Sequence, residues 1–229
     1  MSAGTREPPF GFEVLLVSFI LLLFIPDLFG GEFSSFLSRV LSSFILVSSL
    51  YIVVLRRKDF IVGLLLAVPT VLSDWLPVAL VTEGSQLLVF SVFKTAFLIY
   101  ISFHIFRYLL NARRIDAEII YAAICLYLLT GMTWSLIYFG IILVDPEAIS
   151  LKVDTYATDS HSVAILLREL VYFSYVTQTT LGYGELTPAS GIARAFVIAQ
   201  ALFGQIYIAV IIARLVGLQI AMATIEESN

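Results

Sequence analysis

The sequence predicts an all-α membrane protein with six transmembrane helices and a further, shorter helix that enters the membrane without crossing it. Of its 229 residues, 60% are hydrophobic and 13% are charged, and the mean hydropathy is +0.99. Soluble domains carry about 25% charged residues, so this composition excludes an ordinary soluble domain. The apolar residues are gathered into long runs, and a Gly- and Thr-rich stretch interrupts these runs near the C-terminal end.

The apolar runs define the elements. A bilayer core about 30 Å thick needs roughly 20 apolar residues per helix. Runs of this kind cover residues 12–29, 36–55, 60–80, 86–110, 117–143 and 191–218. A seventh stretch, 163–178, is too short to span before glycines end it, and it predicts a re-entrant half-helix. We therefore expect an N-terminal four-helix domain, residues 1–114, and a second domain, residues 115–229, that contains the half-helix.

Basic residues in short loops predict the orientation. They follow the second and fourth segments: Arg56, Arg57, Lys58, Arg107, Arg113 and Arg114. The short loops at the other side, 30–35 and 81–86, contain none. We expect a multi-pass protein of the cell membrane with both termini in the cytoplasm and with membrane lipids as partners. The formal net charge of −4 argues against nucleic acid as a partner.

The polar stretch FSYVTQTTLGYGELTP, residues 173–188, lies between the half-helix and the last apolar run. A dehydrated monovalent cation needs a cage of oxygens, and backbone carbonyls that point the same way can supply it. That ribbon requires unusual dihedral angles at alternate positions, which Gly182 and Gly184 adopt at little steric cost. Thr180 adds a hydroxyl at the inner end. One strand cannot enclose an ion, so several copies of the chain around an axis are expected.

The segment TQTTLGYGE resembles the selectivity filter of the tetrameric potassium-channel family, Thr-x-Thr-Thr-x-Gly-Tyr-Gly. The similarity covers residues 117–220 and implies an outer helix, pore helix, filter and inner helix in a homotetramer. It implies that K⁺ binds the backbone carbonyls of the filter and the Thr180 hydroxyl. The implied ion-binding residues are Thr180, Leu181, Gly182, Tyr183 and Gly184. The expected supporting residues are Thr179, Glu185, Tyr172 and Phe173, with Glu185 standing where the family has aspartate and the two aromatic rings bracing Tyr183.

Gly204 lies in the last apolar run where the inner helix of this family has its hinge glycine. The alternative is that Gly204 only allows close helix packing. The resemblance also implies that Ile208, Ile212 and Val216, at four-residue steps, line the inner pore. The alternative for these three is packing against the outer helix or lipid.

The six-segment layout is similar to that of voltage-gated channels, but the fourth segment lacks their repeated arginines. Lys94 is its only firm charge before Arg107. Steep gating needs about 3–4 charges per subunit, so we expect weak or no voltage dependence. Asp74 and Lys94 fall at similar depths below the outer surface, roughly 9–12 Å at about 1.5 Å per residue. We expect them to form an intramembrane charge pair, the alternative being that Lys94 reaches the interface alone.

The resemblance therefore implies a passive potassium-selective channel, with K⁺ as the transported ion and no cofactor. The alternatives are a non-selective cation channel, or a potassium-transporter-type subunit that needs a partner. An accessory subunit stays possible in either case. An enzyme is not expected, since the sequence has no His-Glu-x-x-His motif, no Gly-x-Ser-x-Gly motif and no metal-ligating cluster.

Overall fold

The computed structural model describes residues 11–29, 31–53, 57–75, 84–112, 115–151 and 160–227. Arg56, Arg113 and Arg114, on which the predicted orientation partly depends, lie outside these ranges. The described part is mostly helical and contains two short strands. The helices are α1 (Gly11–Leu28), α2 (Gly31–Val53), α3 (Arg57–Trp75), α4 (Gly84–Asn111), α5 (Ala117–Val144), α6 (Ser160–Gln178) and α7 (Gly191–Glu227), and the strands are β1 (Ile149–Ser150) and β2 (Thr187–Pro188).

The helices differ in their ability to cross a membrane. Within the described residues, three stretches are long and apolar enough: Gln86–Asn111, Ala117–Val144 and Gly191–Ile220. The apolar parts of α1, α2 and α3 are shorter: Gly11–Ile25, Phe36–Leu50 and Ile61–Trp75. At about 1.5 Å per residue these three extend roughly 22 Å, less than the bilayer core of about 30 Å. The lengths of α4, α5 and α7 therefore agree with three of the six predicted spans, and the other three spans stay a prediction.

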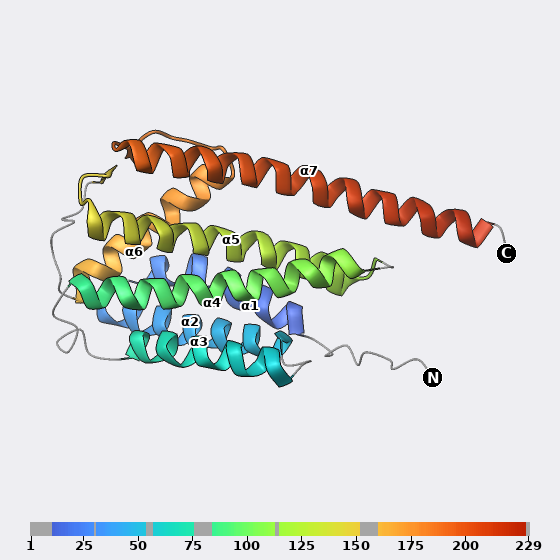
Figure 1. Cartoon of the computed structure of the whole chain (residues 1–229), viewed down its shortest axis with the longest axis horizontal. Coiled ribbons are helices and arrows are strands. Elements are labelled where there is room, and N and C mark those ends of the chain that lie inside the picture. The colour runs from blue at the N-terminus through green and yellow to red at the C-terminus, as the bar shows by residue number, and fades with distance from the viewer. Residues whose placement is uncertain are drawn as a thin grey trace.

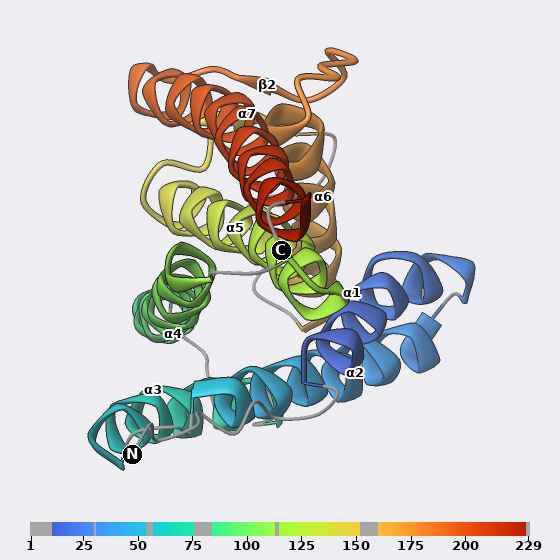
Figure 2. The same ribbon diagram turned by 90° about the vertical axis from the view of Figure 1, so that its right-hand side faces the viewer.

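The helices form layers around α5. In Figure 1, α4 and α5 run side by side, α2 and α3 lie on one side of them, and α7 lies on the other. The end view in Figure 2 shows the same order, with α6 beside α5 and α7. One core cluster includes Phe19 of α1, Phe97 and Ile101 of α4, and Leu129 of α5, all with exposed fractions of 0%. The two expected domains therefore share a hydrophobic core.

Side-chain caps fix where α5 and α7 begin. Asp116 caps α5, where its Oδ1 accepts a hydrogen bond from the Ile119 N–H at 2.9 Å. Ser190 plays the same part for α7, since its Oγ accepts from the Ala193 N–H at 3.1 Å. Strands β1 and β2 pair antiparallel, with Ser150 opposite Thr187. This pairing ties the segment after α5 to the segment that leads into α7.

Helix α7 is mostly uncovered by its own chain. Only 11% of its apolar span is buried, and its buried positions, Ala193, Gln200, Gly204 and Tyr207, form one helical stripe. Large apolar side chains occupy the other faces; for example, Leu202 is 59% exposed and Ile206 60%. So much exposed apolar surface marks a helix that contacts lipid or other chains.

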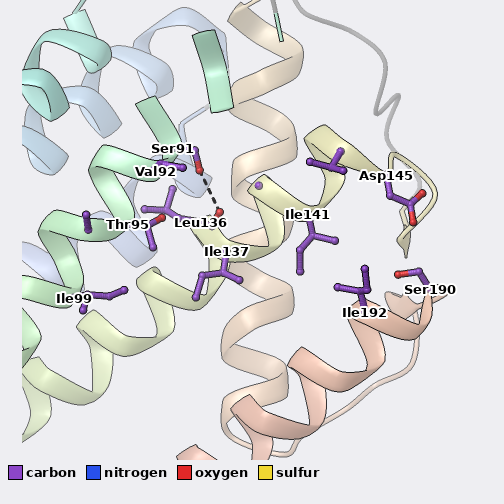
Figure 3. Close-up of a pocket in the computed structure, with 13 residues that line it drawn as sticks. Ser91, Val92, Thr95, Ile99, Leu136, Ile137, Ile141, Asp145, Ser190 and Ile192 are labelled. Carbon is purple, nitrogen blue, oxygen red and sulfur yellow. Dashed lines mark hydrogen bonds between the residues drawn. The ribbon is translucent and has the colours of Figure 1, made fainter. Parts of the chain in front are cut away.

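An apolar cavity of about 510 Å³ opens between α4 and α5 (Figure 3). Val92 and Ile99 of α4, Ile137 and Ile141 of α5, and Ile192 of α7 line it. Within it, Ser91 Oγ donates a hydrogen bond to the Leu136 carbonyl at 3.3 Å (Figure 3). No residue of the TLGYG segment lines this cavity.

Candidate selectivity filter

The TLGYG segment begins where α6 ends, and backbone hydrogen bonds fix that junction. The Thr180 N–H donates to the Thr177 carbonyl at 3.0 Å, and the Leu181 N–H donates to the Val176 carbonyl at 3.0 Å. The Gly182 N–H also points at the Val176 carbonyl, at 3.4 Å. These bonds satisfy carbonyls that the end of a helix leaves without partners. The ribbon therefore leaves α6 in a defined direction.

Along the ribbon the sign of φ alternates. It is positive at Thr180 (+59°), Gly182 (+53°) and Gly184 (+91°). Thr180 is the one non-glycine residue with positive φ among those the structure describes, so Leu181 and Tyr183 between them keep ordinary values. A left-handed conformation at a residue other than glycine costs about 1–3 kcal/mol and is found preferentially at functional sites. The alternation is the backbone pattern that a ribbon of carbonyls with one common direction requires.

The ribbon is not enclosed by its own chain. Leu181 is 54% exposed and Tyr183 is 68% exposed. A Cβ placed on Gly182 or Gly184 would meet no other atom within 4 Å. Both glycines are therefore required by their positive φ and not by crowding within the chain.

Glu185, directly after the ribbon, is bound to α6. The Tyr172 hydroxyl donates a hydrogen bond to Glu185 Oε1 at 2.5 Å. That bond raises the pKa of the Tyr172 hydroxyl to about 12. The hydroxyl is protonated at neutral pH even at its ordinary pKa of about 10, so the shift extends the pH range over which it donates. The carboxylate that replaces the aspartate of the resembled family thus has a partner within its own chain.

Phe173 and Thr179, which were also expected to support the ribbon, make their contacts with α5 and α6. Phe173 is buried, with its ring edge-on to Tyr138 of α5 at a centroid distance of 5.1 Å. It packs α6 against α5, and the expected bracing of Tyr183 stays a prediction. Thr179 turns its hydroxyl back onto α6, where Oγ1 donates to the Tyr175 carbonyl at 2.7 Å.

Gly204 lies in the buried stripe of α7, against the end of α6. A Cβ at this position would collide with the Gln178 carbonyl oxygen and approach Gln178 Cγ to 3.1 Å. Helix α7 continues through Gly204 without a break, from Gly191 to Glu227. The structure thus gives Gly204 a packing role, and its role as a hinge stays a prediction.

The expected inner-pore residues lie on a face of α7 that its own chain leaves open. Ile208 is 39% exposed, Ile212 55% and Val216 50%. Gln205 is exposed nearby, and its Nε2 donates a hydrogen bond to Thr180 Oγ1 at 3.4 Å. Gln205 was not predicted as a site residue, although a polar side chain within an apolar span is a recognisable signal of function.

Asp74 and Lys94, the expected charge pair, come from α3 and α4. Lys94 Nζ lies 2.7 Å from Asp74 Oδ1, and the two side chains are 19% and 15% exposed. Ser42 of α2 donates to the other carboxylate oxygen, Asp74 Oδ2, at 3.0 Å. Nearer the C-terminal end of α4, Arg107 Cζ lies over the ring of Phe103, 5.8 Å from the ring centroid. Lys94 and Arg107 are the two basic residues of this helix.

Two contacts join α6 and α7 to the N-terminal helices. Arg214 Nη2 donates to the carbonyls of Leu109, Leu110 and Ala112, at 3.0, 2.6 and 3.3 Å, where α4 ends. Arg168 Nη2 of α6 donates to Ser34 Oγ of α2 at 3.0 Å. Neither contact was predicted from the sequence, because each joins segments more than 100 residues apart.

Comparison with known proteins places the site in context. The model of the ion channel family matches residues 158–218, which contain all of α6, the TLGYG segment and most of α7. No curated protein and no solved structure matches the chain. Together with the apolar helices, the match shows a membrane protein that carries an ion channel domain.

Proposed function

We propose that the protein is a potassium-selective channel that conducts K⁺ passively through a pore on the axis of a homotetramer. The observation that carries this proposal is the alternation of φ at Thr180, Gly182 and Gly184, in a ribbon that follows α6 within the ion channel domain. Helix α6 ends at the start of this ribbon, and the C-terminus of a helix carries a partial negative charge of about half an electron. That charge favours a cation at the inner end of the filter.

In this proposal K⁺ exchanges its water for protein oxygens. The carbonyls of Thr180, Leu181, Gly182 and Tyr183 form successive rings of four oxygens, and Thr180 Oγ1 contributes the innermost ring. Gly184 supplies the positive φ that ends the ribbon. The bond from Tyr172 to Glu185 holds the outer end of each ribbon.

The exposed surfaces support assembly with further copies of the chain. The ribbon is open within one chain, and α7 leaves most of its apolar faces uncovered. Around a four-fold axis, neighbouring chains would cover part of these faces, Ile208, Ile212 and Val216 would line the inner pore, and lipid would cover the remainder. We place the protein in the cell membrane, with both termini in the cytoplasm.

We propose that this channel responds weakly or not at all to voltage. One charge moved across the whole membrane gains about 2.3 kcal/mol per 100 mV, and steep gating needs about 3–4 charges per subunit. Lys94 is held by Asp74, and Arg107 is the one other Lys or Arg residue of α4, so this helix offers at most one further charge to the field.

A non-selective cation channel is the second candidate, and Leu181 and Glu185 are the observations that favour it. The resembled family has aspartate in place of Glu185, and the TVGYG form of its filter has valine in place of Leu181. A larger side chain behind the ribbon could widen it and weaken the preference for K⁺ over Na⁺.

An ion-flux assay on the purified full-length protein in liposomes tests the proposal. Vesicles loaded with K⁺ should release it when the protein is present, and vesicles loaded with Na⁺ should release little. Equal release of the two ions would favour the non-selective channel. A monomeric or dimeric mass for the conducting protein would contradict the homotetramer.

A further inference from the structure

Behind the filter, four buried polar residues join α5, α6 and α7. Tyr138 of α5, Ser174 and Gln178 of α6, and Gln200 of α7 each have an exposed fraction of 0%. Buried amides and hydroxyls are costly unless their hydrogen bonds are made. A cluster of this kind at the end of the pore helix therefore calls for an account of every bond.

Gln200 uses both ends of its amide. Its Oε1 accepts a hydrogen bond from the Tyr138 hydroxyl at 2.6 Å. Its Nε2 faces three acceptors: Ser174 Oγ at 2.8 Å, the Ser174 carbonyl at 3.0 Å and Gln178 Oε1 at 3.3 Å. This arrangement of one donor and three acceptors fixes which end of the amide carries nitrogen. Gln200 is therefore held in one orientation.

Gln178 continues the same chain of bonds. Its Nε2 donates to the Tyr127 carbonyl at 2.8 Å and approaches Thr130 Oγ1 at 3.4 Å. Its own backbone carbonyl accepts from the Tyr127 hydroxyl at 3.3 Å and packs directly against Gly204. The last residue of α6 is thus held by side chain and backbone together.

The bonds run in one direction, from Tyr138 to Gln200, then to Gln178 and back to α5 at Tyr127. We call the four buried residues Tyr138, Ser174, Gln178 and Gln200 the glutamine bridge. Hydrogen bonds in such a series strengthen one another in a buried setting. The bridge ends at Gln178, and Thr179 and the filter ribbon follow at once, so a displacement of Gln178 is passed to the ribbon.

We propose that the glutamine bridge positions the selectivity filter, and that Gln200 is its central residue although it contacts no ion. This inference rests on the proposed function. A shift of a carbonyl ring changes the balance between K⁺ and the smaller Na⁺, because the ring must replace the water of one ion better than that of the other. Loss of the bridge should therefore reduce selectivity, beyond any loss of stability.

The test compares Gln200→Met, which keeps the length of the side chain and removes its hydrogen bonds, with Gln219→Met. Gln219 is exposed on the same helix and lies outside the bridge. The full-length proteins are heated in K⁺ and in Na⁺ buffers of equal ionic strength, since an ion that binds only the folded filter raises the melting temperature. The K⁺/Na⁺ permeability ratio is then measured in bilayers.

We expect wild type and Gln219→Met to melt higher in K⁺ than in Na⁺ by the same increment. Gln200→Met should lose most of that increment, and its permeability ratio should fall about tenfold, the equivalent of one lost hydrogen bond of about 1.4 kcal/mol. A residue with a purely structural role would lower both melting temperatures equally and leave the increment and the permeability ratio unchanged. That result would overturn the proposal.

A second variant and the behaviour of wild type separate the remaining outcomes. If Gln200→Met does not assemble, Tyr138→Phe removes a single bond of the bridge and should reduce the K⁺ increment to a smaller extent; an unchanged increment would refute the bridge. If wild type itself shows neither a K⁺ increment nor K⁺ selectivity, the proposed function fails, and the role of the bridge fails with it. If wild type is selective and Gln200→Met folds and is equally selective, the proposed function stands and the proposed role of the bridge is refuted.

Discussion

Lys94 and Asp74 form an ion pair between α4 and α3, with Nζ 2.7 Å from Oδ1 and both side chains mostly buried. Removing one partner of such a pair leaves a charge in a poorly solvated place. We expect Lys94→Met to destabilise the protein strongly in the wild-type background and weakly in an Asp74→Asn background. The coupling should amount to at least about 1 kcal/mol, measured by a double-mutant cycle of thermal unfolding. Additive effects would show that the two charges do not stabilise each other.

The contact between Gly204 and the Gln178 carbonyl leads to a second prediction. We expect Gly204→Ala to destabilise the assembled protein, because the new methyl group collides with backbone that cannot rotate away. Gly217→Ala in the same helix is the matched control, since a Cβ there meets nothing within 4 Å. That control should be neutral or stabilising by up to about 1 kcal/mol, as alanine is the better helix former. A Gly204→Ala protein that is as stable as wild type but opens differently would contradict the packing role and support the hinge role.

Gln205 faces the inner end of the ribbon and bonds to Thr180 Oγ1. We expect Gln205→Leu to lower the single-channel current, because four apolar side chains would replace four amides where K⁺ enters the filter. Gln219→Leu changes the same residue type about four turns further from the ribbon on the same helix, so it should lower the current less than Gln205→Leu. A wild-type current in Gln205→Leu would show that this amide does not meet the ion path.

Arg214 ties the inner part of α7 to the end of α4 by bonds to the carbonyls of Leu109, Leu110 and Ala112. A cation at a helix C-terminus is favoured by the helix dipole, and a hydrogen bond from a charged donor contributes about 1.5–3 kcal/mol. We therefore expect Arg214→Met to lower the free energy of unfolding by roughly 2 kcal/mol. Arg214→Lys keeps the charge but not the planar donor. Its free energy of unfolding should lie between those of Arg214→Met and wild type. Equal stability of all three proteins would contradict a structural role for this contact.

Much of the chain from residue 117 onward follows from local sequence. The predicted run 117–143 matches α5, the predicted start of the last run at 191 is the start of α7, and the half-helix ends at Gln178 as expected. Length, apolarity and glycine position determine these features, and each can be recognised within a few turns of chain. The predicted pair of Asp74 and Lys94 used only helix depth, which also follows from counting residues.

The features that the sequence did not reveal depend on contacts between distant segments. Gln178 and Gln200 bond to each other and to α5 only because three helices converge. Arg214 meets carbonyls about 100 residues earlier in the chain. The placement of Phe173 against Tyr138 depends on how α6 is rotated, which hydrophobic pattern alone does not determine.

The most direct test is the reversal potential of the purified full-length protein in planar bilayers with opposed K⁺ and Na⁺ gradients. A potassium-selective homotetramer would give a reversal near the K⁺ equilibrium potential. Gly182→Ala should abolish that selectivity, because a side chain at φ +53° strains the ribbon although no atom lies within 4 Å of its Cβ. A wild-type reversal near zero, or one near the K⁺ potential that survives Gly182→Ala, would contradict the assignment of this ribbon as a potassium filter.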